Sequence, residues 1–265
     1  MTTAAATDET SSTADVLLAL RNVSKSFGST RAVRNVSLTI RPGEVVGLIG
    51  DNGAGKSTIV KMVTGYFPPT SGSVTFKGRD TRLSPAAARN LGIEAVYQDL
   101  ALIGGLSLWR NFFLGKELKI GPGWLPMRPL DKGRMRRLTL RKLEDLGLTR
   151  IHSTNETASR LSGGEKQSLA ITRAVHFGAQ LLLLDEPTAA LSVRETVNVL
   201  DTIRQAADRG LGVLYIDHNM AHVQPVADRI IVLEHGSIVS EHKGSDVTVD
   251  DLAEMLSSVR REREI

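Results

Sequence analysis

The stretch that decides the fold is Gly50-Asp51-Asn52-Gly53-Ala54-Gly55-Lys56-Ser57-Thr58, which we call the phosphate loop. It follows an apolar run typical of a buried strand, 45–49, and leads into a run with helical spacing. Its glycines let backbone N–H groups close around a phosphate, and the following helix directs its positive N-terminus at the same charge. Lys56 adds a point charge for the outer phosphates, the Ser57 hydroxyl suits Mg²⁺, and Thr58 is expected to cap or pack. The loop therefore predicts a nucleotide site at the start of a helix.

The composition narrows the class of protein. A chain of 265 residues can form one domain with a sizeable insertion, and the absence of cysteine excludes disulfides, thiolate metal sites and cysteine nucleophiles. The first residues carry no signal-peptide pattern, and no apolar run approaches the roughly 20 residues that span a bilayer. The net charge of +4 is spread among interspersed acids, and the dense basic stretch 134–142 has the spacing of a solvated helix face. The net charge alone leaves nucleic acid or an anionic membrane surface possible as a partner, but the interspersed acids weigh against both, and we expect no nucleic-acid partner.

The periodicity predicts an α/β fold. Strand-like runs at 16–27 and 32–40 predict an antiparallel start, and the later alternation of apolar runs with helical spacing predicts a parallel sheet covered by helices. β-Branched runs disappear between about 100 and 160, which indicates an inserted helical lobe. Its aromatic residues are either docking residues or, as we expect for most of them, part of that lobe's core: Trp109, Phe112, Phe113 and Trp124. The expected division is a disordered lead (1–15), a main domain (16–245) with the helical insertion (about 100–160), and a C-terminal helix within 246–265.

The same patterns predict the individual elements. Strands are expected at 45–49, 74–77, 93–97, 181–184, 212–216 and 229–233. Helices are expected at 56–65, from 85, and at 106–113, 131–146, 165–177, 193–209 and 248–261, with a turn at 68–72.

Two acidic residues end the apolar run 181–184. In a parallel sheet such a run places Asp185 and Glu186 at the carboxyl edge, where open α/β sheets bind ligands. Asp185 is expected to orient Mg²⁺, and Glu186 is expected to act as general base towards an attacking water.

A second phosphate-binding pattern is Leu161-Ser162-Gly163-Gly164-Glu165-Lys166-Gln167, which we call the signature segment. Ser162 and Glu165 match a capping box at the start of a helix. Gly163 and Gly164 are poor helix formers, but they leave a bare, positive helix N-terminus that a phosphate can approach closely. The two interpretations are compatible, since Ser162 can cap the free protein and contact phosphate when a nucleotide arrives.

Together these patterns resemble the ATP-binding subunit of ATP-binding cassette (ABC) transporters, over about Leu17 to Glu241. The resemblance implies that the phosphate loop is Walker A, that the signature segment is the family signature, and that 181–186 is Walker B with Glu186 as the catalytic glutamate. The cofactors that it implies are ATP and Mg²⁺, within a P-loop NTPase core that carries an antiparallel β-subdomain and an inserted helical subdomain.

The resemblance also implies roles for three further residues. Gln98 would touch Mg²⁺ and relay to the membrane subunit, His218 would sense the γ-phosphate, and Phe27 would stack on adenine. The implied catalytic residues are Glu186, His218 and Gln98, and the implied metal ligands are Ser57, Gln98 and Asp185. The implied nucleotide contacts are Phe27, the phosphate loop, Ser162, Gly163 and Gly164.

One segment departs from the family pattern. Where the family often has Ser-Ala-Leu-Asp after Walker B, this chain has Ala189-Ala190-Leu191-Ser192. The same departure is common in ATPases of bacterial simple-sugar importers, which the chain also resembles at 92–102, 185–192, 218–220 and 226–230. The loop aspartate that helps pair the two sites is therefore replaced by Ser192.

The resemblance implies a particular assembly. Two copies would pack head to tail, so that ATP on Lys56 of one copy meets Ser162 and Gly164 of the other. Many sugar-importer ATPases fuse two cassettes, but this sequence contains one set of motifs and would act as a homodimer. Its other partners would be an integral membrane permease and, through it, a periplasmic substrate-binding protein. Its place would be peripheral, at the cytoplasmic face of the inner membrane.

Two other classes of function stay open at this stage. A soluble ABC ATPase acting on nucleic acid or ribosomes would tend to carry a long coiled coil or a charged linker between two cassettes, and this sequence has neither. A non-hydrolysing nucleotide-binding adaptor would show no Mg²⁺-dependent ATP turnover.

Overall fold

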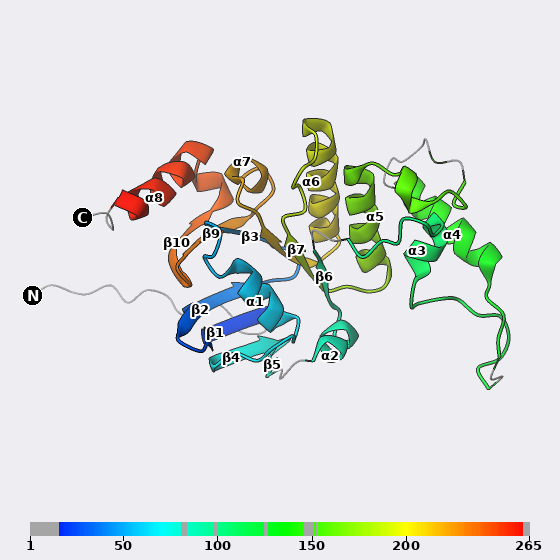
Figure 1. Ribbon diagram of the computed structural model, residues 1–265, viewed down its shortest axis with the longest axis horizontal. Coiled ribbons are helices and arrows are strands. Elements are labelled where there is room, and N and C mark those ends of the chain that lie inside the picture. The colour runs from blue at the N-terminus through cyan, green and yellow to red at the C-terminus, as the bar shows by residue number, and fades with distance from the viewer. Residues whose placement is uncertain are drawn as a thin grey trace, which may run out of the picture.

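The structure, a computed structural model, describes residues 16–80, 84–97, 100–124, 127–145, 151 and 153–261, arranged as two sheets with surrounding helices (Figure 1). The strands are β1 (Leu18–Phe27), β2 (Thr30–Ile40), β3 (Val45–Ile49), β4 (Ser71–Phe76), β5 (Arg79–Asp80), β6 (Ile93–Val96), β7 (Leu181–Asp185), β8 (Gly212–Ile216), β9 (Arg229–Glu234) and β10 (Ser237–Lys243). The α-helices are α1 (Lys56–Val63), α2 (Pro85–Asn90), α3 (Leu108–Phe113), α4 (Lys132–Asp145), α5 (Gly163–His176), α6 (Val193–Asp208), α7 (Met220–Val223) and α8 (Val249–Arg261). The predicted lead, 1–15, and Gln98 lie outside the described residues.

The smaller sheet is antiparallel, in the order β2-β1-β4-β5. β1 and β2 form the predicted hairpin, which ends with Phe27 opposite Thr30. β4 starts earlier than predicted, because Ser71 pairs with β1. Gly72 fits there only without a side chain, since a Cβ would lie 2.4 Å from the carbonyl oxygen of Asn22. Residues 71–72, predicted as part of a turn, are therefore strand.

The larger sheet has the order β10-β9-β3-β8-β7-β6. The strands from β9 to β6 run parallel, and β3 and β8 are buried along their whole length. Such burial is expected where helices cover both faces of a sheet. β10 was not predicted; it pairs antiparallel with β9 at the edge, and its alternating exposure gives a weaker sequence pattern than an apolar run. This order places the carboxyl ends of β3, β8 and β7 side by side.

Two hydrophobic cores lie on the two faces of the larger sheet. Val46 and Leu48 of β3 face the core shared with α1 and the smaller sheet. Val45 and Ile49 face the core shared with α5, α6 and α7, because successive side chains of a strand point to opposite faces. β3 is thus packed from both sides, and the phosphate loop starts from an immobilised strand.

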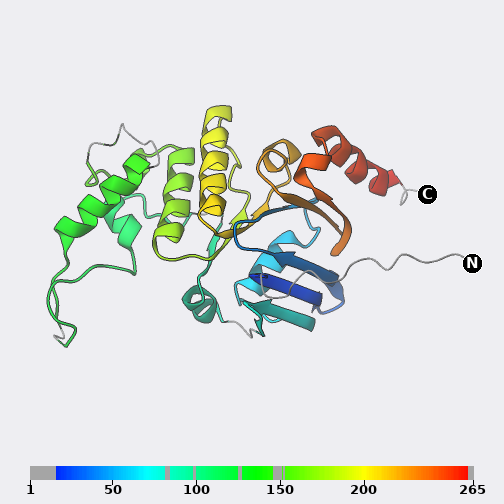
Figure 2. The same ribbon diagram turned by 180° about the vertical axis from the view of Figure 1, so that it is seen from behind.

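The inserted region forms a helical lobe around α3 and α4, at the opposite end of the molecule from α8 (Figure 2). Trp109, Phe112 and Phe113 fill its core as predicted, whereas Trp124 is 81% exposed. The basic stretch 134–142 lies on α4 with its arginines exposed, and the Arg136 guanidinium lies 5.4 Å from the centroid of the Trp109 ring. The basic face is therefore largely solvated, as expected.

Most helix ends lie within two residues of the predicted bounds; α1 ends at Val63 and α3 begins at Leu108, each two residues inside its prediction. α5 begins at Gly163, earlier than predicted, and the short helix α7 was not predicted. Among the described helices, none is both long enough and apolar enough to cross a bilayer.

Candidate functional site

The phosphate loop leaves the end of β3 and turns into α1. Its glycines adopt backbone conformations that L side chains rarely take, with φ of +155° at Gly50, +84° at Gly53 and +105° at Gly55. A Cβ at Gly50 would lie 2.1 Å from the carbonyl oxygen of Leu233, so this close turn requires glycine. A Cβ at Gly53 would have nothing within 4 Å. The loop is thus tightly packed at its base and open at its tip, which suits a phosphate cradle.

The other members of the loop have distinct positions. Asn52 is exposed, Asp51 is half-buried, and Ala54 is buried. The backbone N–H of Thr58 donates to the carbonyl oxygen of Gly55 at 3.0 Å, which places Thr58 in the first turn of α1.

Lys56 begins α1, and its side chain is buried. Its Nζ donates hydrogen bonds to the carbonyl oxygens of Gly50 at 2.6 Å and Asp51 at 3.0 Å. Burial lowers the pKa of Lys56, and the carboxylates of Glu186 and Asp185 oppose that shift. The ammonium is therefore held inside the loop by carbonyl groups that it can exchange for phosphate oxygens.

Ser57 and Asp185 form a pair of oxygen donors beside Lys56. The Ser57 hydroxyl donates to the carboxylate of Asp185, which lies at the end of β7. Burial raises the pKa of Asp185, and the neighbouring charge of Glu186 raises it further. Within the described residues no group of three or more His, Asp or Glu side chains could hold a metal by itself. The pair fits Mg²⁺, which commonly binds one or two protein oxygens and completes its shell with phosphates and water.

Glu186 and His218 meet above the neighbouring strands β7 and β8. Glu186 has φ of +51°, and its backbone N–H donates to the carbonyl oxygen of Ile216 at 2.9 Å. Its Oε1 lies 3.2 Å from Nδ1 of His218. Because an ionised carboxylate only accepts hydrogen bonds, this contact requires the imidazole proton on Nδ1. The histidine side chain is 59% exposed, so its position depends mainly on the loop that carries it.

The signature segment forms the start of α5. Ser162 caps the helix: its Oγ accepts from the N–H of Glu165 at 3.3 Å, and the Glu165 carboxylate accepts from the N–H of Ser162 at 2.8 Å. The predicted capping box is confirmed. α5 packs on α6, α3 and β6, whereas α1 packs on β2 and β7.

A residue that was not predicted, Glu195 of α6, contacts the signature segment. Its Oε1 accepts a hydrogen bond from the N–H of Gly164 at 3.3 Å, and its Oε2 accepts from the N–H and hydroxyl of Ser192 at 3.0 and 2.8 Å. Hydrogen bonds from the hydroxyls of Ser192 and Ser162 lower the pKa of Glu195 to about 2. Ser192 therefore caps α6, and the sequence signal was the second S-x-x-E pattern at 192–195.

The model of the ABC transporter family matches residues 33–189. The chain belongs to the ABC transporter family. It is 44% identical, over 91% of its length and 94% of the relative's, to the xylose/arabinose import ATP-binding protein XylG of Sulfolobus acidocaldarius. It is 38% identical, over 92% of its length and 95% of the relative's, to the fructose import ATP-binding protein FrcA of Rhizobium meliloti.

Solved ABC cassettes share the fold. A nucleotide-free ATP-binding cassette from an ABC transporter superposes with a TM-score of 0.76 at 26% identity, covering 90% of this chain and 95% of that one. A dimeric cassette, MJ0796 bound to ADP and Pi after hydrolysis, superposes with a TM-score of 0.70 at 27% identity, covering 86% of this chain and 98% of that one. The chain is therefore an ATP-binding protein of the ABC ATPase fold, with ATP hydrolysis as its family activity.

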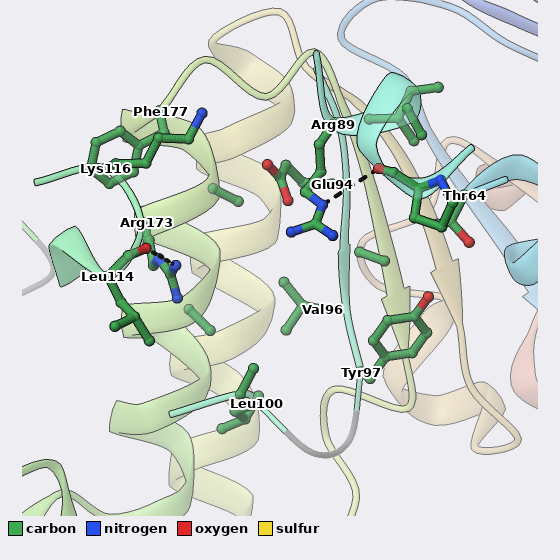
Figure 3. A pocket seen from close by; sticks show the side chains of 18 of the residues that line it. Thr64, Arg89, Glu94, Val96, Tyr97, Leu100, Leu114, Lys116, Arg173 and Phe177 are labelled. Atoms are coloured by element: carbon green, nitrogen blue, oxygen red, sulfur yellow. Dashed lines mark hydrogen bonds between the residues drawn. The ribbon is translucent and has the colours of Figure 1, made fainter. Parts of the chain in front are cut away.

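The ABC cassette also contains a cavity of about 410 Å³ between the larger sheet and the helical lobe (Figure 3). Glu94 and Arg89 lie on the side of β6 and α2, and Arg173 and Lys116 lie on the side of the helical lobe. The Arg173 guanidinium donates to the carbonyl oxygen of Leu114 at 2.8 Å, and burial raises the pKa of Glu94.

Two further predicted site residues are Phe27, for adenine, and Gln98, for Mg²⁺. Phe27 ends β1 and is 47% exposed, with its ring 5.2 Å from that of Phe67 in an edge-on contact, so it is accessible for stacking. Gln98 lies outside the described residues; Tyr97 and Leu100, which are described, line the cavity of Figure 3.

Proposed function

We propose that this chain is the ATP-hydrolysing subunit of an importer for a simple sugar, acting as a head-to-tail homodimer beneath an integral membrane permease. One observation carries the proposal. The sheet order sets β3, β8 and β7 side by side, so that the phosphate loop, His218 and the Asp185–Glu186 pair meet at one edge of the sheet. These are the parts that a phosphoryl-transfer site requires.

Each residue of this edge has a distinct task. Lys56 and the backbone N–H groups of the phosphate loop would bind the phosphates. When bound, Mg²⁺ would neutralise phosphate charge, and Ser57 and Asp185 are the described residues that would hold it. Glu186 would accept a proton from the attacking water through the carboxylate oxygen that His218 does not contact.

The second copy would supply the signature segment. Ser162, Gly163 and Gly164 lie at the N-terminus of α5, a favourable end for a phosphate. Support for a paired arrangement comes from the dimeric form of the similar cassette bound to ADP and Pi. ATP would then stabilise the closed dimer through its higher affinity for that state, and hydrolysis would release it.

The permease would dock at the cavity of Figure 3. The cavity opens between the sheet and the helical lobe, and Tyr97 and Leu100 line it. A docked segment would therefore contact both parts of the ATPase at once. The protein would then lie peripherally, at the cytoplasmic face of the inner membrane, and a periplasmic binding protein would supply the sugar to the permease.

The sugar class rests on the relatives. Among the relatives, XylG is named as a xylose/arabinose import protein and FrcA as a fructose import protein. Both are matched over almost their own full length, 94% and 95%, and these single-cassette relatives support the proposed homodimer.

The test combines hydrolysis with transport. The purified chain should hydrolyse Mg²⁺-ATP at a rate per chain that rises with protein concentration, and Lys56→Ala should abolish it. Lys61→Ala, an exposed lysine on the same helix, is the matched control and should leave the rate unchanged. In vesicles with its permease and binding protein, uptake of a labelled pentose or fructose should require ATP. Stimulation by ribosomes or RNA, with no membrane partner, would overturn the proposal.

A further inference from the structure

A buried carboxylate lies directly beside His218. Asp217 follows β8 and is 2% exposed. Its Oδ2 accepts hydrogen bonds from the hydroxyl of Thr188 at 2.6 Å and from the hydroxyl of Tyr215 at 3.0 Å, and its Oδ1 accepts from the N–H of Asn219 at 2.9 Å. The charge is thus satisfied by hydroxyl and backbone donors, as a buried carboxylate requires.

Thr188 connects this carboxylate to the opposite loop. Its hydroxyl has one hydrogen, which goes to Asp217, so the 2.9 Å contact with Nδ1 of His222 must use the N–H of the imidazole. On the other side of the ring, Nε2 of His222 lies 3.1 Å from Nδ2 of Asn219, whose Oδ1 accepts from the N–H of Ala221. The network therefore joins the loop after β7 to the loop after β8 and to α7.

The two loops that are joined carry Glu186 and His218, the general base and the histidine of the proposed reaction. Glu186 lies just before Thr188 in one loop, and His218 directly follows Asp217 in the other. Their contact at 3.2 Å is partly solvent-exposed, with side-chain exposures of 26% and 59%. A contact of this kind is positioned mainly by its backbones, and the buried Thr188–Asp217 bond fixes those backbones relative to each other.

We propose that Thr188 and Asp217 are positioning residues for ATP hydrolysis, whose buried hydrogen bond holds His218 in register with Glu186. The inference rests on the proposed function, since it concerns the same site. It assigns a role to two residues, Thr188 and Asp217, that were not among the predicted site residues.

Tyr215 provides a matched control. Its hydroxyl donates to the same oxygen of Asp217 from the adjoining strand β8, and it also lies 3.2 Å from the hydroxyl of Thr188. Because the hydrogens of both hydroxyls go to Asp217, no hydrogen is left for a bond between them, and Tyr215 satisfies the carboxylate without a hydrogen bond to the loop after β7. A purely structural role predicts equal effects of losing either donor. A positioning role predicts that only the loss of the Thr188 donor slows catalysis.

The experiment compares Thr188→Val, Thr188→Ser and Tyr215→Phe. Thr188→Val should lower kcat about ten- to a hundredfold, as expected for a small misplacement of reacting groups, with KM for ATP within about twofold of wild type. Thr188→Ser should restore most of kcat, and Tyr215→Phe should leave it within about twofold. If Thr188→Val does not fold, Asp217→Asn replaces it, because the amide keeps the shape but loses one acceptor oxygen.

A double variant tests whether the effect passes through His218. In a His218→Ala background, Thr188→Val should cause little further loss of the residual rate. Equal losses of kcat in Thr188→Val and Tyr215→Phe, or full additivity with His218→Ala, would overturn the inference while leaving the proposed function intact. A wild-type chain without Mg²⁺-dependent ATP hydrolysis would instead overturn the proposed function, and the inference with it.

Discussion

Glu195 carries a carboxylate that the N-termini of two helices share. It accepts from Gly164 at the start of α5 and from Ser192 at the start of α6. Because helix N-termini carry partial positive charge, an anion between two of them is stabilised by both. The hydrogen bonds from Ser192 and Ser162 hold the pKa of Glu195 at about 2.

The low pKa of Glu195 predicts a pH-dependent contribution to stability. A carboxyl group whose pKa is lowered by folding stabilises the protein above its ordinary pKa of 4.5, and the contribution is lost as the pH falls towards about 2. The difference in Tm between wild type and Glu195→Gln should be constant above about pH 5.5 and should narrow below pH 4.5. Glu144→Gln, at an exposed position of α4, is the control. A difference that does not change with pH would contradict the assignment.

Glu186→Gln should separate ATP binding from hydrolysis. The amide keeps the shape of the side chain but cannot act as a general base, so kcat should fall at least about 100-fold. Nucleotide affinity should change little, because the phosphate loop is untouched. Single-turnover hydrolysis and nucleotide titration measure the two effects, and Glu156→Gln in the helical lobe should change neither. Retained turnover in Glu186→Gln would assign the base elsewhere.

At the residue scale, local patterns predicted the phosphate loop, the acids after β7 and the Ser162 cap. They did not predict Thr188, Asp217 or Glu195. Each of the three has one partner in a distant segment, since Thr188 bonds to Asp217 and Glu195 accepts from Gly164. Single-sequence patterns contain no information on which segments a fold brings together. Glu195 alone had a local signal, the capping pattern that begins at Ser192.

At the scale of the elements, β3 and α7 pack closely because residue 47 of β3 is a glycine. A Cβ at Gly47 would lie 2.3 Å from Cγ1 of Val223 on α7 and 3.2 Å from Cβ of Ala227. α7 can therefore lie against β3 only because residue 47 is glycine. α7 begins directly after the loop that carries His218, so its position also affects the proposed site.

Gly47→Ala should destabilise the protein. The added methyl group must displace Val223, and overpacking of this kind costs about 1–3 kcal/mol. Chemical denaturation should show the loss as a lower midpoint. Gly105→Ala is the control, because its Cβ would meet nothing within 4 Å. Equal midpoints for the two variants would show that α7 adapts without cost.

Strands and helices with a clear hydrophobic pattern were predicted, and those with a weak pattern were not. Fully apolar runs predicted β3, β7 and β8 almost to the residue, because strands buried on both faces need apolar side chains at every position. β10 and α7 were missed. β10 alternates between half-buried and exposed side chains, and α7 is too short to show a helical period.

At the scale of the whole molecule, the cavity of Figure 3 lies where the sheet and the helical lobe meet. The net charge of its walls is positive, because they carry three cationic side chains, Arg89, Arg173 and Lys116, and one carboxylate, Glu94. A permease segment that docks here should therefore carry acidic groups, because complementary charge favours association.

Lys116→Glu should weaken coupling to the permease. Lys116 is exposed, so the fold should be retained, and reversal of its charge should reduce permease-stimulated ATPase activity at least about tenfold. Basal hydrolysis by the isolated chain should stay unchanged. Lys132→Glu, at an exposed position of α4 outside the cavity, is the control. Unchanged stimulation in Lys116→Glu would place the docking surface elsewhere.

In a single chain, the N–H of Gly164 already donates to an anion that belongs to the protein. In the proposed pair, a phosphate arriving from the other copy would have to take the place of the Glu195 carboxylate, not only of water. Binding would then replace one anion, the carboxylate, by another, the phosphate. The electrostatic free energy gained would be smaller than for a phosphate that binds a helix N-terminus with no anion on it. In the isolated subunit, the Glu195 carboxylate thus already neutralises the positive helix end that would face the second copy.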